Sequence, residues 1–201
     1  MTVQEKTDLA IAAALAAPRP ENPREFDAAY LRRVTAGFGA FFSIAFLLIA
    51  LASVAQAETL SVHGDWAAFK TAENGASVCY IGAEPKKAEG DYARRGDTYV
   101  LVTHRPSLKE NDVVSVRAGY TYKPESEVVV QIGGTSVNLF TREGHAWAYD
   151  TKSDKDLVAA MKRGSTMVIR GTSSRGTLTT DTYSLSGFTA AYNDSRKACG
   201  L

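Results

Sequence analysis

The stretch "DTYVLVTHRPSLKENDVVSVRAGYTY", from Asp97 to Tyr122, decides the fold class of this 201-residue chain. Its two ends, 97–105 and 112–122, are rich in β-branched residues and tyrosine, which favour β-strands. Farther along, the pair Gly133-Gly134 separates two more runs of this kind and can adopt the positive φ angles of a tight hairpin turn. Strands joined by such short turns predict an antiparallel sheet.

The same pattern continues on both sides of this stretch. Further runs of strand-forming residues are "HGDWAAFK", "SVCYIGAE", "EVVVQI", "TSVNLF", "HAWAY", "TMVIRGT" and "TLTTDTYSLSGFTAAY". The last run loses its alternation near Ser186-Gly187, where we expect a bulge or a bend. One segment, "SDKDLVAAMKRG", has helix signals, with Ser153 or Asp154 as N-cap and Gly164 as the terminating residue. About nine short strands and one short helix predict an all-β fold, either an antiparallel β-sandwich or a partly closed barrel.

The N-terminal part of the chain has the features of an export signal. Residues 36–54, "AGFGAFFSIAFLLIALASV", carry no charge and follow Arg32-Arg33. The small residues Ala55 and Ala57 come next, in the A-x-A arrangement that signal peptidases cleave. We therefore predict a signal peptide over 34–57 with cleavage after Ala57, and a retained transmembrane helix is the alternative.

This prediction divides the chain into three parts. Residues 1–33 are a polar extension, either disordered or an artefact of the assigned start site. Residues 58–201 form the β-rich mature domain, which we expect to be periplasmic or secreted. If 34–57 is retained, the domain would instead be anchored in the inner membrane and face the periplasm.

Composition and cysteine content narrow the class of protein further. The formal net charge of +1, with 22% charged residues, gives no indication of nucleic-acid binding, and membrane contact is expected only through an uncleaved apolar segment. The chain has two cysteines, Cys79 and Cys199. In an exported protein an even number predicts one disulfide, whereas in the cytosol the pair would be two free thiols.

The stretch "GTSSRGTLTTDTYSLSGF", Gly171 to Phe188, partly resembles two catalytic motifs but matches neither. It lacks the last glycine of the G-x-S-x-G nucleophile turn, and Thr177 stands where a phosphate-binding loop needs lysine. The sequence instead predicts a hairpin turn at 173–176, with Arg175 in solvent or paired with an acid such as Asp181. The alternative is that Arg175, with Ser174 and Asp181, contacts a binding partner.

Other candidate sites are sparse in the sequence. The histidines His63, His104 and His145 are dispersed, and one close carboxylate, Asp65 beside His63, is too few ligands for zinc. We therefore predict no metal, no cofactor and no catalytic residues. A remaining alternative is a small-molecule-binding or hydrolytic periplasmic protein whose site assembles from dispersed residues such as His104, Asp181 and Ser184.

Taken together, the mature domain resembles the invasion-associated locus B family of alphaproteobacterial envelope proteins. The matching segments are "GDW" (64–66), "CYI" (79–81), "AGYTY" (118–122), "LVAAMKRGSTMVIRG" (157–171) and "SSRGTLTTDTYSLSGFTAA" (173–191). The N-terminal extension departs from this family, and any further disulfide of relatives is absent because only two cysteines occur.

The resemblance implies a secreted or periplasmic β-rich protein, linked in some pathogenic members to entry into host erythrocytes and without known catalytic activity. We therefore expect a non-enzymatic exported envelope protein that acts as a binding module. Its role would lie in host interaction or envelope maintenance, and its partner would be a protein or another envelope component.

Overall fold

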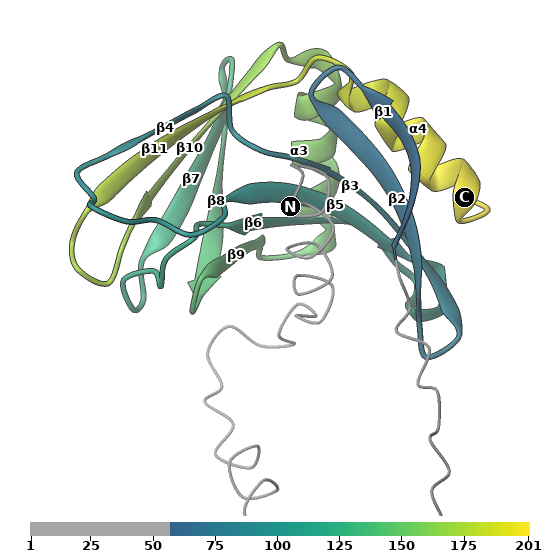
Figure 1. Ribbon diagram of the computed structural model, residues 1–201, viewed down its shortest axis with the longest axis horizontal. Coiled ribbons are helices and arrows are strands. Elements are labelled where there is room, and N and C mark those ends of the chain that lie inside the picture. Colours follow the sequence, from purple (N-terminus) through teal and green to yellow (C-terminus); the bar gives the residue numbers. More distant parts are fainter. Residues whose placement is uncertain (1–56) are drawn as a thin grey trace, which may run out of the picture. The chain divides into compact units, whose positions relative to one another are not determined.

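The computed structural model describes residues 57–201, so the predictions for 1–33 and for nearly all of 34–57 lie outside the described residues. This part of the chain forms one sheet, two α-helices and one short 3-10 helix (Figure 1). Its elements are β1 (Glu58–His63), β2 (Trp66–Glu73), β3 (Ala76–Ala83), β4 (Lys87–Gly90), β5 (Tyr99–Arg105), η1 (Pro106–Leu108), β6 (Glu110–Arg117), β7 (Glu127–Ile132), β8 (Thr135–Arg142), β9 (His145–Ala148), α3 (Thr151–Arg163), β10 (Thr166–Thr172), β11 (Leu178–Ser184) and α4 (Phe188–Ala198). Within the described residues, no helix combines the length and apolarity needed to span a membrane.

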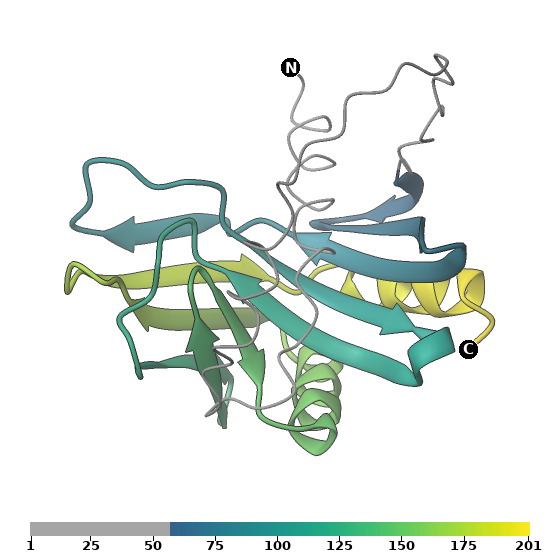
Figure 2. The same ribbon diagram turned by 90° about the horizontal axis from the view of Figure 1, so that it is seen from below.

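The sheet has 11 strands in the order β1-β2-β3-β5-β6-β9-β8-β7-β10-β11-β4, and every neighbouring pair is antiparallel. It bends strongly, as Figures 1 and 2 show. Because residues 84–86 alone separate β3 from β4, the chain passes directly from one half of the sheet to the far edge of the other. The predicted all-β fold is confirmed: the two halves share one core, as in a β-sandwich, although all strands belong to a single sheet.

Short turn sequences set the register of the hairpins. Asn74 and Gly75 both have positive φ angles, 50° and 80°, and connect β2 to β3. Gly133, with φ 55°, begins the turn between β7 and β8, which the sequence predicts. The predicted turn at 173–176 is also confirmed, since the Gly176 amide donates to the Ser173 carbonyl between β10 and β11.

The structure differs from the sequence-based expectation in three elements. The edge strands β1 and β4 were not predicted as strands, and β4 is exposed at all four positions. The C-terminal run was predicted to continue as strand, but the chain turns at Gly187 (φ 87°) and forms the second helix, α4. The predicted break near Ser186-Gly187 is therefore the start of a helix. In α3 the N-cap is Asp150, whose carboxylate accepts a hydrogen bond from the Ser153 amide at 2.7 Å.

One hydrophobic core joins both halves of the sheet and both helices. The spacing of Leu157, Val158 and Met161 turns one face of α3 toward this core, and Phe188, Ala191 and Tyr192 do the same for α4. Its large members include Trp66, Ile81, Val102, Val128, Leu139, Leu157, Met161, Ile169, Tyr183, Phe188 and Tyr192. The helices therefore lie on the core side of the sheet (Figures 1 and 2).

Two glycine turns hold the start of the sheet against the start of α4. A Cβ at Gly187 would collide with the His63 carbonyl, and one at Gly64 would lie 2.7 Å from the Ser186 carbonyl oxygen. Beside this contact the Trp66 ring meets the Phe188 ring edge-on at 4.9 Å. The segments "GDW" and "SGF" are thus complementary parts of one joint, and neither glycine can accept a side chain without displacing backbone.

Candidate functional site

The predicted disulfide forms between Cys79 on β3 and Cys199 at the C-cap of α4. The two Cα atoms are 5.9 Å apart and 120 residues apart in sequence. Cys79 is fully buried, and its backbone lies beside that of His104 on β5. The covalent link therefore fastens the end of α4 to β3, next to a buried histidine.

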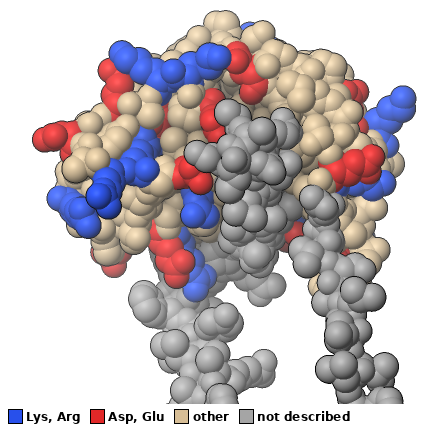
Figure 3. Space-filling view, in the orientation of Figure 1, with Lys and Arg blue, Asp and Glu red and all other residues tan. Residues whose placement is uncertain are grey.

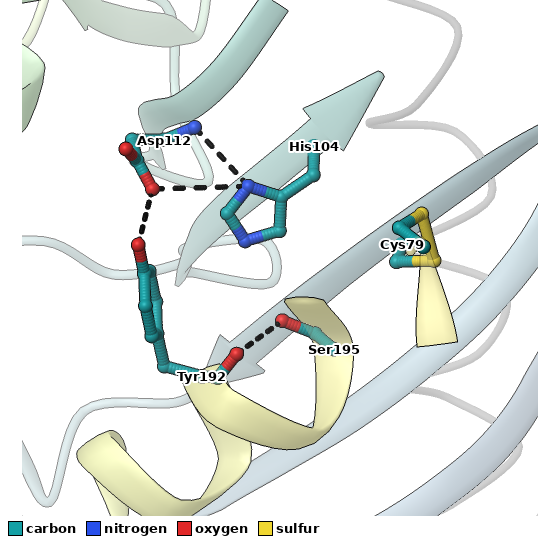
Figure 4. The surroundings of a disulfide bond; sticks show 6 residues. Cys79, His104, Asp112, Tyr192 and Ser195 are labelled. Carbon is teal, nitrogen blue, oxygen red and sulfur yellow. Dashed lines mark hydrogen bonds and ion pairs between the residues drawn. A yellow bond between two sulfur atoms is a disulfide. The ribbon is translucent and has the colours of Figure 1, made fainter. Parts of the chain in front are cut away.

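A buried polar cluster surrounds this histidine (Figure 4). The His104 Nδ1 accepts a hydrogen bond from the Asp112 amide at 3.2 Å, and the Tyr192 hydroxyl donates to the Asp112 Oδ1 at 2.6 Å. Asp112 adopts a positive φ of 65°, a conformation that non-glycine residues seldom take. Its backbone is held there by contacts with β5 and α4 rather than by an intrinsic preference.

Burial sets the ionisation of this cluster. It lowers the pKa of His104 to about 4, despite the opposing charge of Asp112, so the imidazole is neutral at pH 7. Burial and the hydrogen bond to Asp112 raise the pKa of Tyr192 to about 12, so its hydroxyl remains a donor. The His104 Nε2 is buried and has no hydrogen-bond partner among the described residues.

Two cations border the cluster at the surface. The Lys162 Nζ lies 3.7 Å from the centroid of the Tyr192 ring, and the Arg196 guanidinium lies 5.7 Å from it. Arg196 also approaches Asp112, with 3.7 Å between the Nη1 and the Oδ1. Both residues stand in the last turns of their helices, where a positive charge interacts favourably with the helix dipole. Lys162 of α3 also contacts the Tyr192 ring of α4, so it contributes to the α3–α4 contact.

A second buried cluster joins β11 to the loop that precedes β5. Both carboxylate oxygens of Asp181 on β11 accept hydrogen bonds from Arg95, at 2.6 Å each. The Arg95 Nε donates to the Ala118 carbonyl, and its guanidinium lies 5.1 Å from the Tyr120 ring centroid. Burial alone would lower the pKa of Arg95, but hydrogen bonds and the charge of Asp181 raise it above the usual value. The pair fastens the loop before β5 to the core.

The structure separates the residues predicted to contact a partner. Ser174 and Arg175 are exposed at the tip of the β10–β11 hairpin, whereas Asp181 is 3% exposed and fully engaged by Arg95. Of the two positions expected for Arg175, the structure has the exposed one, and Asp181 pairs with Arg95 instead. Below the tip, the Ser173 hydroxyl accepts hydrogen bonds from the amides of Arg175 and Thr177 and fixes the turn.

The alternative site of dispersed residues is not assembled. His104 bonds with Asp112 beside α4, Asp181 bonds with Arg95, and the Ser184 hydroxyl accepts from the Ser186 amide. Each residue belongs to a different local network. Within residues 57–201, no three His, Cys, Asp or Glu side chains are grouped closely enough to hold a metal ion.

The side of the sheet opposite the main core carries two further clusters of buried apolar side chains. Aromatic residues on nearly every strand suggest that some rings lie outside the core, but the sequence does not indicate which ones. Eight apolar side chains of six adjacent strands point away from the core and form what we call the aromatic face: Phe69, Val78, Tyr80, Tyr99, Leu101, Val113, Phe140 and Trp147. The rings stack in pairs, with centroids 5.1 Å apart for Phe69 and Tyr80 and 5.8 Å apart for Phe140 and Trp147. The signal was present in "YVLV", 99–102, because a run of consecutive apolar residues indicates burial on both faces of a strand.

Comparisons with known proteins agree with the motifs. Residues 66–196 match the sequence pattern of the family described as invasion associated locus B (IalB) protein. No curated protein is detectably similar to this chain. Among solved structures, the crystal structure of invasion associated protein B from Bartonella henselae is similar, with 16% sequence identity and a TM-score of 0.48 over 69% of this chain and 95% of that chain. Because the family pattern extends over about two thirds of its length, from the joint at Trp66 to the last turn of α4, the chain belongs to the invasion associated locus B family.

Proposed function

We propose that this protein is a non-enzymatic, exported binding module of the cell envelope that engages a protein or another envelope component through the aromatic face. The observation that carries this proposal is the face itself. Five aromatic and three aliphatic side chains lie together on six strands, and the helices α3 and α4 both pack on the opposite side. These side chains are buried and form two neighbouring clusters, one on β2, β3 and β5 and one on β6, β8 and β9. An apolar area on a side of the sheet that neither helix covers is typical of an interaction site.

The buried polar clusters support a structural rather than a catalytic role for their residues. Asp181 accepts hydrogen bonds from Arg95 on both oxygens, and Asp112 accepts one from the Tyr192 hydroxyl while its amide donates to the His104 Nδ1. A general base must reach a substrate proton, and His104 is 0% exposed. These side chains therefore fit a rigid scaffold that presents a surface.

The disulfide supports location in an oxidising compartment, either the periplasm or the exterior. A domain held at the inner membrane by an uncleaved 34–57 segment is the alternative arrangement, and it would face the same compartment. In both cases the aromatic face meets envelope components. Whether the protein serves host interaction or envelope maintenance then depends on which partner binds this face.

Charge supports an apolar mode of binding. Lys and Arg side chains are interspersed with Asp and Glu on the side drawn in Figure 3, which does not favour nucleic acid as a partner. The exposed tip at Ser174 and Arg175 is a second, smaller contact in this proposal. Asp181 contributes from beneath by stabilising β11 and does not touch the partner.

A capture experiment tests the proposal with matched variants of the 58–201 domain. Phe140→Lys places a charge on the aromatic face, and Thr180→Lys places the same charge on the outward side of β11. We expect the unchanged domain and Thr180→Lys to retain the same crosslinked partners from envelope extracts or host-cell membranes, and Phe140→Lys to lose them. Circular dichroism checks that all three proteins are folded.

Identical partner profiles for Phe140→Lys and the unchanged domain would remove the aromatic face from the proposal. Arg175→Ala, compared in the same experiment, tests the hairpin tip separately. If Arg175→Ala loses the partners and Phe140→Lys retains them, the binding surface is the tip of the β10–β11 hairpin and not the aromatic face.

A further inference from the structure

One end of the aromatic face carries three basic side chains in a row. Backbone pairing places Arg117 of β6 beside His145 of β9, and His145 beside Arg142 of β8. Directly paired residues of an antiparallel sheet project to the same side, with Cβ atoms about 4.5–5.5 Å apart. The three strands are neighbours in the sheet (Figure 1). We call these three residues the basic row.

The basic row borders the apolar side chains directly. The Arg117 guanidinium lies 5.9 Å from the Tyr99 ring centroid, and the His145 ring stacks on the Trp147 ring with 5.5 Å between centroids. Trp147 and Phe140 stand two positions along their strands from the row, about 7 Å away, and pair with each other. A ligand whose charge lies at the row would therefore place its remainder against apolar side chains.

The two arginines of the row have no counter-ion among the described residues. Within residues 57–201, neither Arg117 nor Arg142 forms an ion pair with a carboxylate. Arg105 of β5, by contrast, has Glu73 at 3.1 Å and Glu110 at 3.8 Å. The backbones of Arg117 and Arg142 are two strand intervals apart, about 10 Å, so their long side chains can converge on one anion.

His145, in the middle of the row, leaves a polar atom without a partner. Its Nε2 is buried and has no hydrogen-bond partner among the described residues. Buried polar atoms in proteins nearly always have such a partner. Burial and the charge of Arg117 lower the pKa of His145 against the opposing charge of Glu143, so the imidazole adds no positive charge of its own at pH 7. A bound anion would supply the missing acceptor for Nε2 and the missing counter-charge for both arginines.

Exposure and backbone pairing narrow the class of ligand. Arg142 is exposed and Arg117 and His145 are partly exposed, whereas Phe140 and Trp147 are 6% and 4% exposed, so the row is the accessible end of the site. The strands β6, β9 and β8 each pair with a neighbour on both sides, which leaves no open sheet edge here for an incoming peptide strand. An aliphatic chain needs no hydrogen bonds and therefore fits this position better than a peptide.

We propose that the basic row is the headgroup site for a single anionic lipid whose aliphatic chain lies against the aromatic face. This inference rests on the proposed function and specifies the envelope component as a lipid molecule with one phosphate or carboxylate group. Arg117 and Arg142 bind that group through charge-assisted hydrogen bonds, and the His145 Nε2 donates a further one. Trp147 and Phe140 contact the part of the chain next to the headgroup.

Titration of soluble amphiphiles into lipid-free protein tests this proposal. The protein is the form that cells accumulate from the full-length gene. The ligands are decyl phosphate, decanoate, uncharged decyl maltoside, inorganic phosphate and a hexaglutamate peptide, each below any concentration at which it forms micelles. Calorimetry gives the dissociation constants. The two tryptophan indole N–H signals in NMR spectra locate the ligand, because Trp147 borders the row and Trp66 lies in the main core.

We expect decyl phosphate, decanoate or both to bind more tightly than the other three ligands and to shift the Trp147 signal but not the Trp66 signal. The tighter of the two identifies a phosphate or a carboxylate as the headgroup. Arg117→Gln and Arg142→Gln should each weaken this binding about tenfold or more. Arg170→Gln, which removes the same charge from an exposed position on β10, is the matched control and should leave the binding unchanged. Circular dichroism checks the fold, and the exposed Arg142 is the replacement that the fold tolerates best.

Equal affinities for the anionic amphiphiles and decyl maltoside, or for Arg142→Gln and the unchanged protein, would overturn the proposal. Inorganic phosphate that binds as tightly as decyl phosphate would assign the row to a free anion, and binding of hexaglutamate alone would assign it to an acidic peptide; both results reject the lipid.

Failure of this proposal is distinguishable from failure of the proposed function. If no amphiphile binds but the domain captures a protein that Phe140→Lys loses, the function stands with a protein as the partner. Conversely, amphiphile binding that depends on the row, together with captured proteins that Phe140→Lys retains, would support the lipid site and assign the protein partners to another surface.

Discussion

Removal of the Cys79–Cys199 disulfide should remove a large fraction of the free energy of unfolding of the domain. The bridge spans 120 residues, and the chain-entropy relation for a loop of that length gives about 5 kcal/mol at 25 °C. A single small domain is stable by about 5–15 kcal/mol, so the loss is a large fraction of the whole. We expect the 58–201 domain with Cys79→Ala and Cys199→Ala to unfold at a much lower urea concentration than the oxidised protein.

Several non-covalent contacts hold α4 in place independently, and they allow the folded state to survive this change. Phe188 and Tyr192 are buried, and the Asp194 carboxylate accepts hydrogen bonds from Ser61 at 2.6 Å and pairs with His63 at 2.8 Å. The variant should therefore keep its far-ultraviolet circular dichroism while its free energy of unfolding falls by about 3–5 kcal/mol.

Equilibrium urea denaturation, followed by tryptophan fluorescence, measures the difference. Unchanged protein under reducing conditions is the control and should match the double variant. A loss below about 1 kcal/mol would refute the reasoning, because the α4 contacts alone would then hold the C-terminus and the cross-link would contribute little.

Three further perturbations test other contacts. Asp181→Asn leaves the buried Arg95 without its charge partner and should lower the free energy of unfolding by about 3–5 kcal/mol. Adding Arg95→Met to this variant should recover part of the loss, as measured by urea denaturation. If the losses of the two single variants simply add, the two residues are not energetically coupled. Gly187→Ala should prevent folding or lower the melting temperature severely, since the added Cβ would collide with the His63 carbonyl. Gly133→Ala is the control, because it has open space around it and should cost only the backbone strain of its positive φ. Equal melting temperatures for the two variants would disprove the close contact between Gly187 and His63. The pKa of His104 is about 4 in the folded protein and about 6.5 in the unfolded chain, so the unfolded state binds more protons between these pH values. The free energy of unfolding should therefore fall by about 3 kcal/mol as the pH drops from 6.5 to 4. His104→Gln should flatten this pH dependence in thermal melts, and an unchanged slope would assign the dependence to other groups.

Local sequence signals predicted most of the sheet because its hairpins are encoded by neighbouring residues. Asn74-Gly75 and Gly133-Gly134 supply positive φ angles where the turns need them, and the β-branched runs beside them pair directly. The helix α3 was predicted for the same reason, since its apolar spacing and its terminating Gly164 are local. These elements depend little on distant parts of the chain.

The second helix was missed although its signals were present. Phe188, Ala191, Tyr192 and Ser195 follow the i, i+3, i+4, i+7 spacing of a helical face, and basic residues occupy its last turn. The preceding alternation suggested that the strand continued. Only contact with the sheet reveals why the chain turns at Gly187, because that contact joins residues more than 120 positions apart.

The polar clusters were beyond sequence reasoning for a related reason. Asp181 was a candidate, but its partner Arg95 lies 86 residues away, and no local pattern favours that arginine over Arg175. The Asp112–Tyr192 hydrogen bond likewise joins residues 80 positions apart. Such pairs depend on the bend of the sheet, which brings distant strands together.

The separation of Cys79 and Cys199 by 120 residues also sets the order in which this bridge can form. In any process that delivers the polypeptide N-terminus first, whether synthesis or translocation, the Cys79 thiol is delivered long before its partner. The bridge can therefore close only after the whole segment between the two cysteines has been delivered. A copy truncated within that segment keeps an unpaired Cys79 thiol, which distinguishes it chemically from the closed form in an oxidising compartment.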